Sequence, residues 1–198
     1  MTSDEQKYFI ALIPPEPLFG KIHELKNQVK EAYGARAALR SPPHITLHMP
    51  FIWSERKERR LVDTLREFAA GQKPIEVRIE NYSCFPPRVI FVAVRESAEL
   101  SQLQRELHRF CRVNLNLFNA NYQDRPFHPH ITLAFRDLRK SAFAMAWKEF
   151  SERELTGTFR VEALSLLKHN GKEWQLHAAL PIKREETFKN GENNIPMP

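Results

Sequence analysis

The chain is poor in cysteine and glycine, on which small disulfide-linked folds and phosphate-binding loops depend. It has six glycines and two cysteines among 198 residues. We find no glycine-rich phosphate loop in it. Cys84 and Cys111 have no metal-binding spacing and are too few for a disulfide framework, so we expect reduced, semi-buried thiols.

Long hydrophobic runs are also missing. No stretch approaches about eighteen consecutive apolar residues, so no membrane-spanning helix is expected. The N-terminal sequence MTSDEQKYFIAL has acidic residues where a signal peptide has basic ones. We therefore expect a cytoplasmic protein without membrane partners.

The charge balance is mildly basic, with 30 Lys and Arg against 24 Asp and Glu, a net charge of +6 and a pI near 9.4. Such an excess favours anionic partners, nucleic acid first among them. A basic balance without a binding role is the alternative. The apolar content of 42 % is ordinary for a globular protein, and the length allows one domain or two small lobes.

The first half of the chain predicts strand, helix, strand, helix, strand. KYFIALI (7–13) is a short run of strand formers. Apolar residues then recur at helical spacing up to Gly34, and HITLHM (44–49) follows two prolines as a strand. A second helical pattern begins after Ser54, its expected N-cap, and precedes the alternating strand IEVRIENY (75–82).

The second half predicts the same series again. RVIFVAV (88–94) is a buried strand, Ser97 is the expected cap of a helix, and HITLAF (130–135) is the next strand. A further helix leads to one long strand, FRVEALSLLKH (159–169). The last strand, EWQLHAALPI (173–182), is the expected hairpin partner across an Asn-Gly turn.

One pentapeptide, Pro-His-Ile-Thr-Leu, occupies the same slot in both halves. It occurs in PHITLHMPF (43–51) and in PHITLAFRD (129–137). The repeated context makes chance a weak explanation. We therefore predict an α+β fold built by internal duplication, with bilobal pseudo-twofold symmetry. Two small antiparallel sheets would face each other across a central cleft, with helices on the outside.

The predicted boundaries follow from this duplication. We expect one bilobal domain over residues 1–183, with interleaved lobes and duplication units at about 7–82 and 88–182. Residues 184–198 are polar and lack an apolar period, which is typical of a flexible tail.

The two His-x-Thr strands carry the candidate chemistry. Alternation puts His44 and Thr46 on one face of their strand, and His130 and Thr132 repeat the arrangement. A pseudo-twofold axis would bring both pairs into one cleft. Two imidazoles can supply one base and one acid near neutral pH, and the hydroxyls can hold phosphate oxygens. The pattern therefore indicates phosphoester chemistry that needs no metal and no cofactor.

The paired motifs, the duplication and the C-terminal WQLHAALPI strand resemble the 2H phosphoesterase superfamily, and within it the RNA 2',3'-cyclic phosphodiesterase / 2'-5' RNA ligase group. FIALIPP and VIFVAV add weaker support. The resemblance covers about residues 7–182. It implies hydrolysis of 2',3'-cyclic phosphates at RNA ends or nucleotides to 2'-phosphates. It also implies that His44 protonates the 3' leaving oxygen and that His130 activates water.

Four further residues are candidates for substrate binding. Alternation puts His48 on the His44 face, where it would flank the cleft, and His128 precedes the second motif near its entrance. Arg136 falls one position later than the arginine of close relatives, and strict alternation would still put it on the His130 face. Phe127 could stack a base, although core packing is the ordinary role of a phenylalanine.

Other candidates are weaker. Phe51 and Phe135 are alternative stacking residues. The long loop 113–129 is a candidate substrate-binding segment. Candidates for an electrostatic path to the site are Arg36, Arg40, Arg88, Arg125 and Lys168.

Three rival functions remain open at the level of the sequence. A non-catalytic RNA-end-binding protein would not need an acid and a base. RNA ligation is the reverse of the same chemistry and would use the same site. A metal-dependent hydrolase is disfavoured because no carboxylates cluster near the motifs. We expect a monomer that acts on an RNA end or a cyclic nucleotide.

Overall fold

The computed structural model describes residues 4–118 and 126–182. The predicted tail at 184–198 and Arg125 lie outside these residues. The helices and strands follow one another as β1 (Glu5–Leu12), α1 (Leu18–Tyr33), β2 (Ile45–Ser54), α2 (Glu58–Ala70), β3 (Ile75–Phe85), β4 (Val89–Val94), α3 (Ala98–Leu115), β5 (His130–Ala134), α4 (Lys140–Ser151), β6 (Thr156–Val161), β7 (Ala163–His169) and β8 (Trp174–Pro181), with short 3₁₀ turns at Ala37–Arg40 and Glu55–Lys57.

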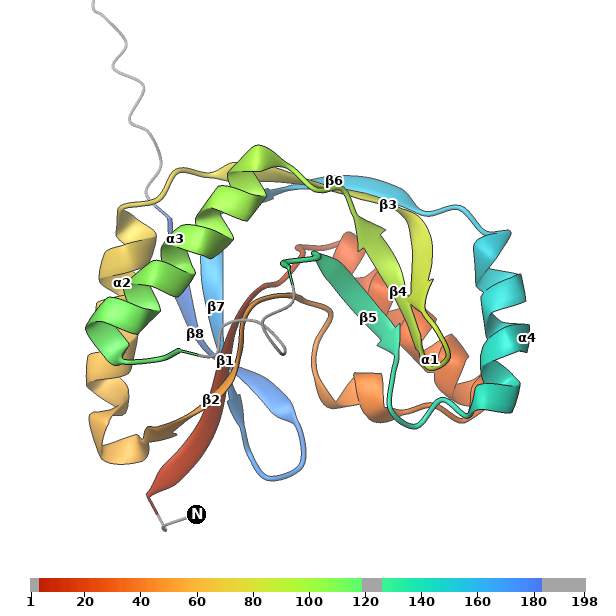
Figure 1. Cartoon of the computed structure of the whole chain (residues 1–198), viewed down its shortest axis with the longest axis horizontal. Coiled ribbons are helices and arrows are strands. Elements are labelled where there is room, and N and C mark those ends of the chain that lie inside the picture. Colours follow the sequence, from red (N-terminus) through yellow and green to blue (C-terminus); the bar gives the residue numbers. More distant parts are fainter. Residues whose placement is uncertain (1–3, 119–125, 183–198) are drawn as a thin grey trace, which may run out of the picture.

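The eight strands form one curled antiparallel sheet in the order β6-β3-β4-β5-β2-β1-β7-β8. The helices α2 and α3 cover the half that contains β2, β1, β7 and β8, and α1 and α4 cover the other half (Figure 1). The predicted α+β fold with outer helices is therefore confirmed, and the two small antiparallel sheets of the prediction are the two halves of one continuous curled sheet. The two four-stranded halves are joined at their centre.

The junction between the halves is the pairing of β2 with β5. A single pair of opposite residues, Ile45 and Ile131, links the two strands. Both side chains are fully buried in the main core, together with Leu47 and Leu133 two positions on. The apolar residues of both repeated pentapeptides thus point toward the helices.

The strand predicted at 159–169 is in fact two strands, so this prediction is wrong. Residues before Glu162 form β6, which pairs with β3, whereas residues after it form β7, which pairs with β1 and β8. The chain therefore crosses from one half-sheet to the other at Glu162. Burial changes with it, because β6 is an edge strand with alternating exposure and β7 is a central strand buried over four successive residues.

Helix ends follow the sequence in some places and not in others. Ser97 caps α3 as predicted, since its side chain accepts a hydrogen bond from the Leu100 amide at 3.1 Å. Gly34 ends α1 in the left-handed conformation, with φ 70°. Ser54 is not a helix cap. It ends β2, and its hydroxyl donates to the carboxylate of Asp4.

The described helices and the two cysteines bear on the predictions of no membrane span and of reduced thiols. None of these helices is long and apolar enough to cross a membrane. Cys84 and Cys111 are free thiols, half-buried and buried respectively. Burial raises the pKa of the Cys111 thiol to about 12, which keeps it protonated and unreactive.

Ile131→Ala should destabilise the protein by about 2–5 kcal/mol, because it leaves a cavity at the junction of the two halves. Urea unfolding followed by circular dichroism measures this. Ile52→Ala is the matched control in β2, where the side chain is 50 % exposed, and it should cost well under about 1 kcal/mol. Equal effects of the two substitutions would contradict a buried junction.

Candidate active site

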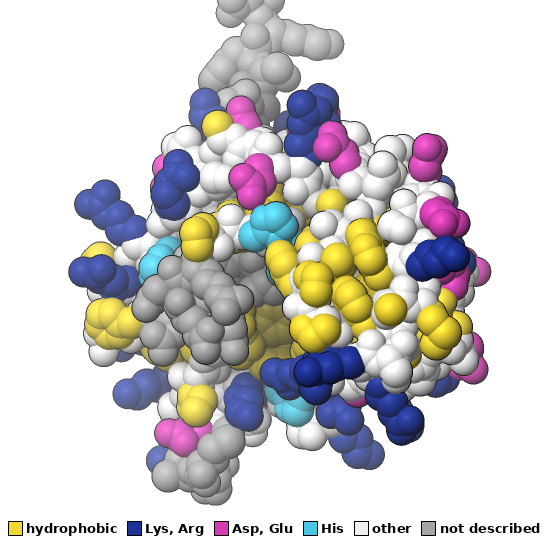
Figure 2. Space-filling model, turned by 45° about the vertical axis from the view of Figure 1, so that its right-hand side comes forward, with side chains coloured by type: hydrophobic (Ala, Val, Ile, Leu, Met, Phe, Trp, Pro, Cys, Tyr) yellow, Lys and Arg dark blue, Asp and Glu magenta, His cyan; other side chains and the backbone are white. Residues whose placement is uncertain are grey.

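The pairing of β2 with β5 brings the two His-x-Thr motifs together. Because Ile45 lies opposite Ile131 in an antiparallel pair, the flanking residues fall beside one another, His44 next to Thr132 and Thr46 next to His130. The isoleucines face the core, so these four side chains project from the other face. Figure 2 shows that the molecule is hollowed, with His side chains at the rim of the hollow.

Each motif histidine is held in the same way. The Nδ1 of His44 lies 2.7 Å from the carbonyl oxygen of Pro42, and the Nδ1 of His130 lies 2.8 Å from that of His128. A carbonyl can only accept, so Nδ1 carries the proton in both rings. In the neutral form each Nε2 therefore has a free lone pair, and in the charged form it can donate a proton.

A phenylalanine from the adjacent strand supports each imidazole. The ring of Phe9 in β1 lies 4.8 Å from that of His44, and the ring of Phe91 in β4 lies 4.9 Å from that of His130. Both phenylalanines are buried. Our sequence reasoning missed them, although the tripeptides Phe-Ile-Ala and Phe-Val-Ala that begin at these positions repeat with the two halves.

The charged form of both histidines is disfavoured in the ligand-free site. Burial, aided by the positive charges of Lys26 and His130, lowers the pKa of His44 to about 3. Burial also lowers the pKa of His130, and the carbonyl bond from its Nδ1 opposes this. Because His130 contributes to the shift at His44, the two imidazoles lie within electrostatic reach. An anionic ligand between them would favour protonation.

Lys26 is a residue of this site that our sequence reasoning missed. It lies in α1, is only 1 % exposed, and donates to the carbonyl oxygens of Ala38 and Ser41, each at 3.0 Å. These carbonyls belong to the segment that leads into Pro42, which accepts from His44. Burial lowers the pKa of Lys26 to about 7. A lysine within an amphipathic helix pattern gave no signal of this role.

The two threonines are half-buried beside the histidines. Within the described part of the chain, neither the Thr46 nor the Thr132 hydroxyl makes a hydrogen bond to protein. Both can therefore donate to a ligand placed between the imidazoles.

His48 does not lie on the same face as His44, so the position predicted from strict alternation is wrong. Thr46 lies opposite Ala11, but His48 lies opposite Ile10, because β2 contains an irregularity between these pairs. One extra residue reverses the face of every later side chain. The ring of His48 is consequently fully buried on the helix side, against Phe51 at 5.4 Å between ring centroids.

The alternation expected for Arg136 also fails. β5 ends at Ala134, and Arg136 has a left-handed backbone with φ 58°. Its guanidinium lies over the ring of Phe135, with 5.1 Å between Cζ and the ring centroid, and the residue is exposed. Nothing in the described contacts joins it to His130.

His128 lies beside His130 as the sequence indicated. Its ring is 6.2 Å from that of His130 and 5.3 Å from that of Phe85, and its Nδ1 is 3.4 Å from a carboxylate oxygen of Glu96. Phe85 is 41 % exposed. His128 and Phe85 thus form an accessible aromatic edge next to His130.

The predicted stacking residues are not the most accessible aromatics. Phe127 is half-buried and packs against the main core, and Phe51 stacks on Tyr8. On the His44 side, Trp174 packs edge-on against Phe9 with 4.7 Å between centroids. Phe85 and Trp174 therefore flank the site, one in each half. The sequence analysis placed Trp174 in the last strand but left Phe85 between two predicted strands, and it indicated neither as a residue of the site.

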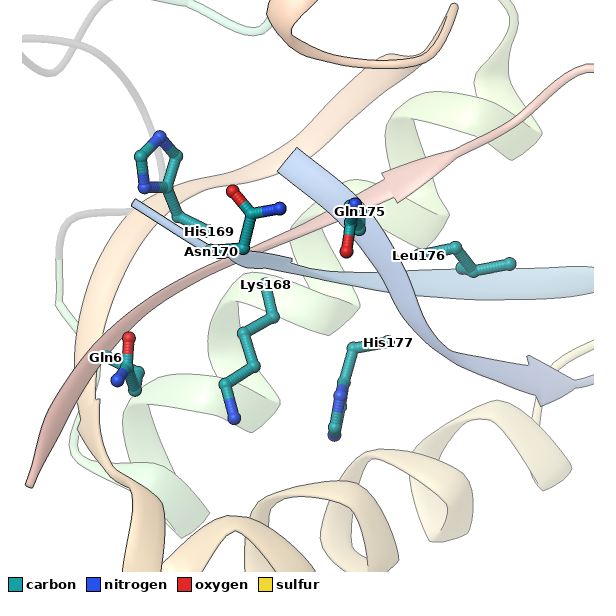
Figure 3. A pocket seen from close by; sticks show the side chains of 7 residues that line it. All are labelled: Gln6, Lys168, His169, Asn170, Gln175, Leu176 and His177. Carbon is teal, nitrogen blue, oxygen red and sulfur yellow. The ribbon is translucent and has the colours of Figure 1, made fainter. Parts of the chain in front are cut away.

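Lys168 is not free to attract substrate. Its ammonium lies 2.6 Å from carboxylate oxygens of both Glu55 and Glu58. Figure 3 shows the adjacent pocket, where Lys168 and His177 point toward α2 and His169 points the other way.

The arginines predicted to form an electrostatic path to the site, Arg36, Arg40 and Arg88, are exposed. Among the residues that the structure describes, no group of three or more His, Cys, Asp or Glu is arranged to hold a metal ion.

The fold and the paired His-Thr face define a class of protein, and comparison with known sequences identifies it. The sequence model of the 2'-5' RNA ligase superfamily matches residues 14–173. The chain therefore belongs to this superfamily, whose members are 2H phosphoesterases.

Relatives and solved structures agree with this assignment. A provisionally named phosphoesterase of Geobacillus kaustophilus is 29 % identical over 91 % of this chain and 99 % of its own length. Another, from Geobacillus sp. strain WCH70, is 32 % identical over 70 % of this chain and 73 % of its own. Two crystal structures share the fold at a TM-score of 0.59, TT0787 of Thermus thermophilus (20 % identity, 90 % and 99 % coverage) and E. coli LigT with 3'-AMP (18 % identity, 91 % and 99 % coverage).

Lys26→Met should raise the pKa of His44 above about 3, because a nearby positive charge is removed, while burial, the larger cause of the lowered pKa, remains. Proton NMR titration of the His44 imidazole, assigned with His44→Gln, measures this. Lys21→Met is the matched control, since Lys21 is an exposed residue of the same helix. An unchanged His44 pKa in both variants would contradict the influence of Lys26.

Proposed function

We propose that the protein is a metal-independent phosphoesterase that opens 2',3'-cyclic phosphates at RNA ends or nucleotides to 2'-phosphates. The observation that carries the proposal is the convergence of two identically held imidazoles, each with Nε2 free, on one face with two unpartnered hydroxyls. Membership of the superfamily supports phosphoester chemistry. A cytoplasmic monomer that needs no cofactor completes the proposal.

The reaction moves one proton at each histidine. Neutral His130 takes a proton from water through Nε2 as the water oxygen forms a bond to phosphorus. The bond between phosphorus and the 3' oxygen breaks, and His44 in its charged form gives a proton to that oxygen. Thr46 and Thr132 donate hydrogen bonds to the non-bridging oxygens, where negative charge accumulates.

His44 can act as the acid only when a bound anion raises its pKa, because the pKa in the ligand-free site is about 3. In the free site its imidazole is neutral, and the phosphate anion of the substrate supplies the charge that makes protonation favourable. An imidazolium with a lowered pKa gives up its proton readily. Protonation and donation would thus be coupled to the presence of substrate.

Two observations support a nucleotide as the rest of the substrate. Phe85 offers an aromatic surface against His130, and Trp174 offers one against Phe9, the residue that contacts His44. The structurally similar E. coli LigT has been crystallised with 3'-AMP. RNA ligation, in which a 5'-hydroxyl of a second RNA end takes the place of water as the nucleophile, would use the same residues. Binding without catalysis would leave the acid and base without a purpose.

His44→Ala and His130→Ala should each lower the turnover of a 2',3'-cyclic nucleotide by about 10²–10⁴-fold, because each removes a proton-transfer group. Turnover is measured in the presence of EDTA, with the 2'-phosphate product resolved by chromatography. His23→Ala is the control, because this exposed histidine of α1 lies outside the site. Loss of wild-type turnover in EDTA, or full activity of either motif variant, would refute the proposal.

A substrate with sulfur at the bridging 3' position should separate the acid from the base. A thiolate leaves without protonation, so His44→Ala should lose far less activity on this analogue than on the oxygen substrate. His130→Ala should lose equally on both. If the pattern is reversed, the roles of the two histidines are exchanged, and equal losses in both variants would contradict the assignment.

A further inference from the structure

The outer face of α3 carries a cluster of basic side chains. Arg105, His108, Arg109 and Arg112 recur at the spacing of one helix face and line a shallow groove of about 380 Å³ with Val113. The opposite face of the helix is buried in the core. A basic helix face is usually just exposed to solvent, so its charge alone does not indicate that it binds a ligand.

Three arginines lie close together on this helix face without an acidic partner among the described residues. Arg105, Arg109 and Arg112 make no ion pair within the described residues. By contrast, Arg59 and Arg66 of α2 both pair with a carboxylate. Three unpaired guanidinium groups along one helix face repel one another and favour a multivalent anion.

Large apolar side chains lie among these charges. Val113 is 73 % exposed and Phe118 is 58 % exposed. Phe118 lies beside the helix, since its carbonyl oxygen is 3.4 Å from Nε2 of His108. A row of cations with an exposed aromatic ring is the arrangement that binds a single-stranded polynucleotide, through its phosphates and one stacked base.

The groove lies close to the catalytic strands. The ring of His108 faces that of His48 at 6.4 Å, and the side-chain amide of Gln104 donates to the carbonyl of Leu47 at 3.3 Å. His48 follows His44 by four residues of β2 but lies on the helix side of the sheet, so a bound RNA would run from the outer side of α3 around to the face that carries His44. On the face seen in Figure 2, Lys and Arg side chains gather to one side of the hollow and along its lower rim.

We propose that Arg105, His108, Arg109 and Arg112, with Phe118, form a docking groove for the body of a single-stranded RNA whose cyclic phosphate end lies between His44 and His130. The proposal rests on the proposed function for the identity of that end. Such a groove would make the protein bind RNA chains of several nucleotides more tightly than mononucleotides. The preference would come from the phosphate backbone and would carry little base specificity.

The test is RNA binding, measured by fluorescence anisotropy, so that it does not depend on turnover. The probe is a single-stranded RNA of about eight nucleotides ending in a 3'-phosphate. Replacing Arg105, Arg109 and Arg112 together by Gln should weaken binding about ten- to hundredfold at 0.1 M salt and reduce the slope of log Kd against log salt by about 2. Phe118→Ala should weaken binding and leave that slope unchanged.

The matched control removes three positive charges from elsewhere. Replacing Arg56, Arg59 and Arg66 by Gln changes the net charge equally, but these arginines pair with Asp4 or Asp63. A loss as large as that of the α3 variant would overturn the proposal. So would unaltered RNA binding by the α3 variant, or a change only in its binding to phosphatidylserine vesicles.

Turnover distinguishes this proposal from the proposed function. If RNA binds through α3 but no cyclic phosphate is opened, the docking groove stands and the catalytic assignment fails. If mononucleotide turnover is intact while the α3 triple variant binds RNA like the wild type, the catalytic assignment stands and the groove fails.

Discussion

The antiparallel pairing of β2 with β5 is the contact on which the rest of the structure depends. Ile45 and Ile131 close the core between two half-sheets. The same register sets His44 beside Thr132 and Thr46 beside His130. A shift of one residue in either strand would turn the histidine and threonine of that strand into the core. One apolar contact thus joins the halves and assembles the candidate site.

Burial, as well as position, sets the electrostatics of the candidate site. Its two imidazoles are neutral without a ligand because burial disfavours their charged forms. The positive charge of Lys26 lowers the pKa of His44 further, and no lysine among the described residues has this effect on His130. The two motifs are therefore alike in sequence and in hydrogen bonding, yet different in electrostatics. This difference gives two identical residue types a physical basis for different roles.

Much of the fold and the centre of the site could be predicted, because the signals are local. Alternation and helical spacing placed most elements, Ser97 marked a helix start, and an Asn-Gly pair marked the β7–β8 hairpin. The repeated pentapeptide identified His44 and His130 with their threonines as the residues that the structure brings together. These features depend on a few consecutive residues, which the sequence displays directly.

Features that depend on distant partners could not be predicted. The irregularity in β2 turns His48 into the core, and the crossover at Glu162 splits one apparent strand between two half-sheets. Lys26 gains its role only because α1 packs over the segment before His44. The sequence by itself determined two His-x-Thr motifs at matching positions and an α+β fold. Only the tertiary structure decided which side chains join them, because strand register and burial arise from contacts between residues far apart in the chain.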